Sequence, residues 1–181
     1  MTVRLLVVAS AATAGTRELV FGGEGEPLDV AAVDRLVGRT AGWWCGPEPT
    51  CAVTGRALGG EPEVVAAFAG PDVGRWRGRS LAEVAAAEPE AARAWLADVA
   101  AAPHGGESLA DLATRVGGQV EAHRWPEGRS VVVVVPLVAR ALAVHALAAP
   151  ASVLLRLDVA PLDRLTLTRG PGGWRLRLAA P

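Results

Sequence analysis

The sequence predicts an α/β fold in which helices pack on a largely parallel sheet. Two uninterrupted apolar runs, at residues 3–9 and 131–135, are typical of strands buried on both faces of a parallel sheet. Segments with helical spacing of apolar residues alternate with these runs, as in βα units. At 181 residues the chain can bury a sizeable core, and we expect a single domain over residues 1–181.

The first half of the chain alternates short strands, helices and loops rich in glycine and proline. Val30, Val33 and Leu36 repeat at helical spacing, which predicts a helix around them. In order, we expect a strand at 3–9, a glycine-rich loop at 22–25, a helix over 27–40, a strand at 43–45, a helix opened by Pro47, and a loop over 60–78 with a short strand at 64–68.

The second half contains the clearest helix and strand signals. Ser80 and Glu83 form a capping box, which marks a helix start. The β-branched run 131–135 predicts a central strand. In order, we expect helices from Ser80, over 88–101 and over 107–122, a turn at 102–106, the strand 131–135, a helix over 137–148, and strands at 153–159, 164–168 and 174–178 with a hairpin turn at 170–173.

Composition and charge exclude several classes of function. The net charge of −1 argues against binding nucleic acid through phosphate neutralisation. The chain has no Lys, Asn, Ile or Tyr, which indicates a GC-rich bacterial genome and makes its arginine content mostly a codon effect. No apolar run reaches the roughly 18 residues of a membrane span. We therefore expect a cytoplasmic protein that binds neither membrane nor nucleic acid.

The cysteine and histidine content predicts neither a disulfide framework nor a metal site. Cys45 and Cys51 are the only cysteines, and their spacing does not suit zinc. We expect two buried thiols and no metal or cofactor. The tryptophan pair 43–44 lies in a predicted strand, so the two side chains should face opposite sides.

Six segments, in order along the chain, together resemble the histidine phosphatase superfamily. They are Leu5 to Thr13, Glu26-Pro27-Leu28-Asp29, Gly46-Pro47 to Thr54, Gly74-Arg75-Trp76-Arg77-Gly78, Pro103 to Ser108 with Arg115, and Val131 to Val135 with Arg140-Ala141-Leu142. The nearest branch includes bacterial alpha-ribazole phosphatases. The resemblance implies a phosphoglycerate-mutase-like three-layer αβα sandwich with a mostly parallel central sheet.

The resemblance also implies where catalytic groups should stand, and none of them is present. In this family a histidine attacks the phosphoryl group, a second histidine and two arginines hold its oxygens, and a carboxylic acid protonates the leaving group. The corresponding positions hold Ala9, Ser10, Thr50, Gly70 and Pro136. We therefore expect that phosphatase and mutase activity is absent, because such groups act as a unit.

Each replacement is small and uncharged, which predicts a wider, more neutral and more apolar pocket. Phe21 and Trp76 are candidates to fill it. The candidate pocket residues are Ser10, Thr13, Arg17, His104, Glu107, Ser108 and Arg140. Several have simpler structural interpretations: Glu107 and Ser108 suit a helix start, and Arg140 suits a tie between a helix and a loop.

Three hypotheses about function remain open. The first is a non-catalytic protein that binds a neutral or apolar small molecule. The second is a scaffold that forms a homodimer or docks a partner enzyme. The third is an enzyme of specialised metabolism with new chemistry, in which Ser10 acts as nucleophile, His104 as base, and Glu107 or Asp72 as orienting acid.

Overall fold

The fold was analysed in a computed structural model. It describes residues 2–23, 25, 27, 28, 30, 33–36 and 38–178. One mixed sheet has the strand order β3-β2-β4-β1-β5-β6. The strands are β1 (Val3–Ala9), β2 (Gly42–Cys45), β3 (Glu63–Val64), β4 (Gly128–Val134), β5 (Arg164–Gly170) and β6 (Gly173–Leu178).

The first four strands of the sheet are parallel, whereas β5 and β6 are antiparallel additions at one edge. The valine run places β4 in the middle, between β1 and β2, and Val131–Val134 are almost completely buried. Burial on both faces selects such β-branched runs. The α/β class and the central position of β4 are therefore confirmed.

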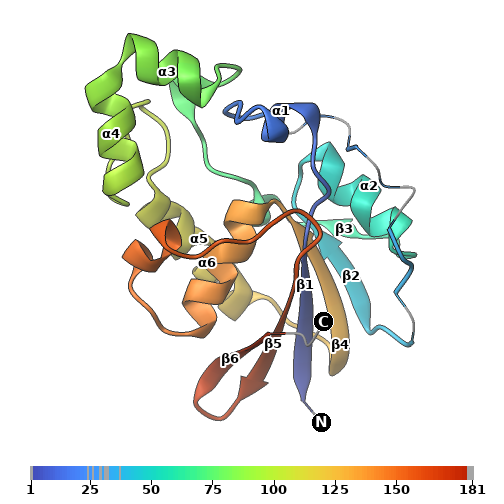
Figure 1. The fold of residues 1–181 in the computed structure, drawn as a ribbon. Helices are drawn as coiled ribbons and strands as arrows, with labels where there is room; N and C mark the ends of the chain where they lie inside the picture. The colour runs from blue at the N-terminus through green and yellow to red at the C-terminus, as the bar shows by residue number, and fades with distance from the viewer. Residues whose placement is uncertain are drawn as a thin grey trace.

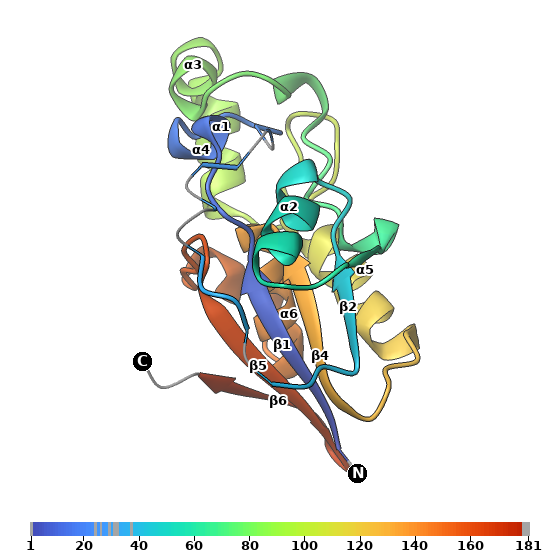
Figure 2. The same ribbon diagram turned by 90° about the vertical axis from the view of Figure 1, so that its right-hand side faces the viewer.

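Helices cover both faces of the sheet (Figures 1 and 2). α5 (Leu109–Ala122) and α6 (Pro136–Ala146) pack together on one face, and α2 (Pro49–Ala57) lies on the other. α1 (Ala14–Arg17), α3 (Leu81–Ala87) and α4 (Pro89–Ala97) lie beyond the ends of the parallel strands. Among the described residues, no helix has both the length and the apolar character that crossing a membrane requires.

The buried apolar residues form two separate clusters. The main cluster surrounds the sheet and includes β1, β4, α5 and α6. The second, which we call the cap cluster, joins the segment after α1 and the segment before α3 to α3 and α4. Its members are Phe21, Val73, Trp76, Val84 and Ala92, with Leu81, Ala91 and Trp95 packed against them.

Two predicted elements are wrong. Residues 33–36 and 38–40 form no helix and Val30 lies in a 3₁₀ turn, so the described part of the range 27–40 does not form the predicted α-helix. Glu26, Asp29, Ala31, Ala32 and Val37 lie outside the described residues. The strand predicted at 153–159 is instead the 3₁₀ helix η4 (Ala151–Leu155) followed by a loop, because Leu154 packs against α5 and α6.

Other elements shift only at their ends. α2 begins at Pro49 rather than Pro47, with the proline in its first turn as expected. The predicted strand at 64–68 becomes β3 and the 3₁₀ turn η2 (Ala66–Phe68). The Ser80–Glu83 capping box is confirmed. Trp44 is buried and Trp43 is half-buried, as their alternation along β2 requires.

Candidate functional site

A cavity of about 590 Å³ lies beyond the ends of β1 and β4, between the main cluster and the cap cluster. The main cluster contributes Val135, Leu137 and Val159 to its walls. The cap cluster contributes Phe21 and Val73, among others. Because both sides are apolar, the cavity can accept an apolar molecule. The polar groups of its wall are few and lie at defined positions.

Aromatic rings form the cap side of this cavity. The Phe21 ring lies 5.3 Å from the Trp95 ring at 81° and 5.1 Å from the Trp76 ring. Phe21 and Trp95 line the cavity, whereas Trp76 is completely buried behind them. Neither predicted filling residue, Phe21 or Trp76, removes the cavity.

Two arginines and one aspartate supply the charges of the cavity walls: Arg17 from α1, Arg140 from α6, and Asp158 from the loop after η4. Nη2 of Arg140 lies 2.6 Å from Oδ1 of Asp158, so Arg140 ties a helix to a loop as expected. Nε of Arg140 is buried and has no hydrogen-bond partner among the described residues.

Small polar side chains pack against the end of β1. The Thr50 hydroxyl donates to the carbonyl of Ala11 at 3.0 Å, and the Thr54 hydroxyl accepts from the amide of Ala11 at 3.0 Å. Ser10 is 2% exposed and lies beside the Cys51 thiol. The two threonine hydroxyls are already paired inside the protein, so they have little capacity left for a ligand.

Glu48 joins this network from the start of α2. Its Oε1 accepts from the Gly70 amide at 2.6 Å, and its Oε2 lies 3.7 Å from Sγ of Cys51. Burial and the neighbouring Glu48 carboxylate raise the pKa of the Cys51 thiol far above its usual value. Cys51 therefore stays a neutral thiol and is not a nucleophile.

His104 lies in the cap region. Its ring is 5.1 Å from the Trp76 ring, and its Nδ1 accepts from the Gly106 amide at 3.0 Å. Burial lowers the pKa of His104, so the ring is neutral near pH 7. No hydrogen bond joins His104 to Ser10 or Glu107 among the described residues, so the proposed nucleophile, base and acid are not assembled into a hydrogen-bonded triad.

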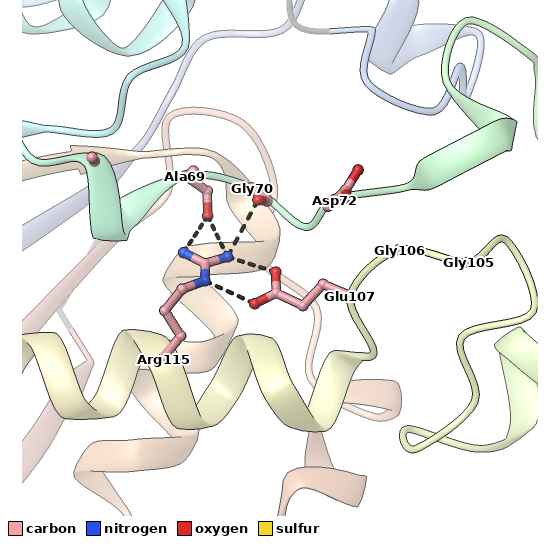
Figure 3. A pocket seen from close by; sticks show the side chains of 8 residues that line it. Ala69, Gly70, Asp72, Gly105, Gly106, Glu107 and Arg115 are labelled. Atoms are coloured by element: carbon pink, nitrogen blue, oxygen red, sulfur yellow. Dashed lines mark hydrogen bonds and ion pairs between the residues drawn. The ribbon is translucent and has the colours of Figure 1, made fainter.

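Glu107 is engaged by Arg115 instead, beside a second, polar hollow of about 490 Å³ (Figure 3). Nε and Nη2 of Arg115 donate to the two carboxylate oxygens of Glu107 at 2.8 and 2.7 Å. The same guanidinium donates to the carbonyls of Ala67, Ala69 and Gly70. Arg115 therefore fastens the loop after β3 to α5, and Glu107 has a structural partner.

A comparison of the sequence with family models shows to which family the chain belongs. Residues 48–180 match the family model described as histidine phosphatase superfamily, branch 1. The chain belongs to the histidine phosphatase superfamily. No protein of curated function matches the chain.

Solved structures show the same fold over nearly the whole length of the chain. A mycobacterial glucosyl-3-phosphoglycerate phosphatase is 22% identical, with 98% of each chain covered and a TM-score of 0.79. The alpha-ribazole phosphatase from Shigella flexneri is 16% identical, covers 97% of this chain and 95% of its own, and has a TM-score of 0.79. A protein described as mycobacterial hydrolase 1 is 22% identical, with 99% and 98% covered and a TM-score of 0.76.

In this histidine phosphatase fold, the structure gathers the positions at which the resemblance places catalytic groups. Hydrogen bonds link Glu48 to Cys51 and to Gly70, and Ser10 lies beside the Cys51 thiol. Ala9 is fully buried and pairs with Val134 at the end of β4, just before the start of α6. The Thr50 hydroxyl donates to the carbonyl of Ala11, the residue after Ser10. The fifth predicted position, Pro136, is the first residue of α6 and lines the cavity.

The seven candidate pocket residues do not form a single site. Arg17 and Arg140 line the main cavity, whereas Glu107 lines the polar hollow. Thr13 caps α1 and Ser108 caps α5, so both have the structural role expected of residues at a helix start. Ser10 and His104 are buried elsewhere, as described above.

Sequence reasoning missed Glu48, Trp95 and Asp158. Trp95 had a weak signal, because an isolated tryptophan on an alanine-rich helix often marks a packed face. Glu48 and Asp158 had none, since their partners are distant in sequence. Among the described residues, no three His, Cys, Asp or Glu side chains cluster where they could hold a metal ion.

Proposed function

We propose that this member of the histidine phosphatase superfamily is a pseudophosphatase that binds a small, largely apolar molecule in the cavity between its two apolar clusters. The observation that carries the proposal is the composition of the cavity walls. Phe21, Val73 and Trp95 face Leu137 and Val159 across a space of about 590 Å³. This volume is within the range of small-molecule sites.

The residues at the predicted catalytic positions support the loss of phosphoryl transfer. Ser10 is buried beside a thiol, the Thr50 hydroxyl is already paired, and Gly70 offers no side chain. A phosphoryl group needs fixed cationic donors, whereas Glu48 places a carboxylate in this network. His104 does not replace the missing nucleophile, because it is buried against Trp76.

A thermal-shift screen tests binding. The panel holds inorganic phosphate, sugar and nucleotide phosphates, corrinoid precursors and neutral aromatic compounds. A ligand at 100 times its Kd adds about 2.7 kcal/mol of stability. In a domain of this size each kcal/mol moves the Tm by about 2–4 °C. We expect a shift with neutral aromatic compounds and none with phosphate esters.

A cavity-filling variant locates the binding. Ala160 lines the cavity and is exposed, so the indole of Ala160→Trp can enter the cavity without disturbing either cluster. Ala86→Trp, on the exposed side of α3 away from the cavity, is the matched control. We expect the shift to vanish only in Ala160→Trp. A shift with phosphate esters, or no shift with any compound, would contradict the proposal.

A further inference from the structure

The charged residues of the cavity wall indicate the charge of the ligand, in addition to its apolar character. Arg140 lines the cavity, and its one hydrogen bond among the described residues goes from Nη2 to Asp158. Nε of Arg140 is buried, and no described residue accepts a hydrogen bond from it. A guanidinium has five N–H donors in a planar fork, so most of the donor capacity of Arg140 is unused.

Asp158 is a weakly held partner for this guanidinium. Its side chain is 91% exposed, whereas that of Arg140 is 29% exposed. An exposed single-oxygen contact contributes little, because water screens it and the side chain loses conformational freedom. A carboxylate that meets Nη1 and Nη2 together would make a bidentate pair with the accessible end of this guanidinium.

We propose that the ligand is an apolar monocarboxylate whose carboxylate replaces Asp158 on Arg140, an inference that rests on the function proposed above. Its apolar part lies between Phe21 and Trp95 on one side and Leu137 and Val159 on the other. Asp158 then acts as a built-in competitor that occupies Arg140 until the ligand displaces it.

The same wall disfavours a phosphate monoester. α6 begins with Pro136, which has no N–H, so this helix start has one backbone donor fewer for an anion. A dianion would also meet the negative charge of Asp158 at the only arginine of α6. At Arg140 itself, a single negative charge on a planar group matches the planar guanidinium.

A matched acid and amide test the proposal by titration calorimetry at neutral pH. 1-Naphthylacetate and 1-naphthylacetamide have the same ring and nearly the same size, and they differ in charge. We expect the acid to bind about ten times more tightly than the amide, since a charge-assisted bidentate pair replaces a neutral contact. Arg140→Met should bring the ratio of the two Kd values to about one.

A second variant should strengthen the binding of the acid instead of weakening it. Asp158→Asn removes the competing carboxylate from an exposed position, so we expect tighter binding of the acid and unchanged binding of the amide. Arg156→Met is the matched control, because Arg156 is an exposed arginine nearby that does not line the cavity. It should change neither Kd.

The outcomes separate this inference from the proposed function. Equal affinities of acid and amide for the unmodified protein would overturn the inference that Arg140 selects a carboxylate. The proposal that the cavity binds an apolar molecule would be unaffected. A preference for the acid that Arg140→Met does not reduce would also overturn it. If neither compound binds, the inference fails, and the thermal-shift panel of neutral compounds shows whether the proposed function fails with it.

Discussion

Glu88 joins three side chains of the cap region. Its carboxylate accepts hydrogen bonds from Arg75, Arg79 at 2.7 Å, and the indole N–H of Trp76 at 3.3 Å. The hydrogen bonds from the two arginines are the main reason that the pKa of Glu88 falls to about 2. A single acid therefore fixes Trp76, which in turn supports the aromatic wall of the cavity.

The Glu88→Gln variant should lower the Tm at neutral pH, because both arginines lose their anionic partner. The folded-state pKa is about 2 and the unfolded value is 4.5, so the unfolded chain binds more protons between these values. The stabilisation is complete above pH 4.5 and is lost as the pH falls toward 2. Urea unfolding of both proteins over this range checks the prediction.

Glu61→Gln is the control for this effect, since Glu61 is exposed and has no ion pair among the described residues. It should leave the pH dependence of unfolding unchanged. A difference between Glu88→Gln and the unmodified protein that grows as the pH falls from 4.5 would show that Glu88 does not hold this network.

Arg115 is the corresponding anchor of the loop after β3. Arg115→Met should reduce the free energy of unfolding by about 2 kcal/mol, because Glu107 and three carbonyls lose a charged donor. Chemical denaturation measures this loss. Arg156→Met, at an exposed position, should cost less than about 0.5 kcal/mol. Equal effects of the two substitutions would contradict the anchoring role.

At the residue scale, the sequence predicts local contacts better than distant ones. The Ser80–Glu83 box and the Ser108 cap follow from spacing within one helical turn, and both are confirmed. The ion pair of Arg115 with Glu107 spans eight residues, and the contact of Glu48 with Gly70 spans 22. No local rule produces such pairs, because the tertiary fold brings them together.

At the element scale, α5 carries two adjacent glycines with opposite surroundings. A Cβ on Gly118 would meet nothing within 4 Å, whereas a Cβ on Gly117 would lie 2.6 Å from Nδ1 of His145. Gly118→Ala should therefore raise the free energy of unfolding by about 0.5–1 kcal/mol. Gly117→Ala should give less than this gain or destabilise the protein.

Thermal and urea unfolding of both α5 variants compare the two positions directly. His145 is held by Glu121 at 3.0 Å, so its ring cannot move away without breaking that contact. An equal gain from both substitutions would show that α5 and α6 are less closely packed at Gly117 than the structure indicates.

The sequence predicts best the elements whose burial follows a simple pattern. β1 and β4 are buried on both faces toward their C-terminal ends, and α5 shows a regular apolar face, so their patterns are unambiguous. The segment 153–159 has a similar apolar run, but proline at 150 and packing on α6 favour a 3₁₀ turn there. Helical spacing in 27–40 is likewise insufficient, since residues 33–36 lie as a coil with Val33 and Leu36 against the main cluster.

At the scale of the whole molecule, the fold places two apolar clusters on either side of a cavity. The family resemblance predicts where the catalytic groups should stand, and the structure brings those positions together at one end of the sheet. The cavity walls could not be predicted, because Phe21, Trp95 and Val159 come from segments far apart in sequence. These residues come together only when the cap cluster packs beside the main cluster, and hydrophobic periodicity in the sequence does not predict that packing.

The proposal that this chain has lost phosphoryl transfer is tested most directly by measuring phosphate release from p-nitrophenyl phosphate and from sugar phosphates by the purified protein. We expect no release above that of buffer at neutral or mildly acidic pH, and no difference between the unmodified protein, Ser10→Ala and Thr50→Ala. Turnover that either substitution abolishes would contradict the claim that this histidine phosphatase fold has lost its original chemistry.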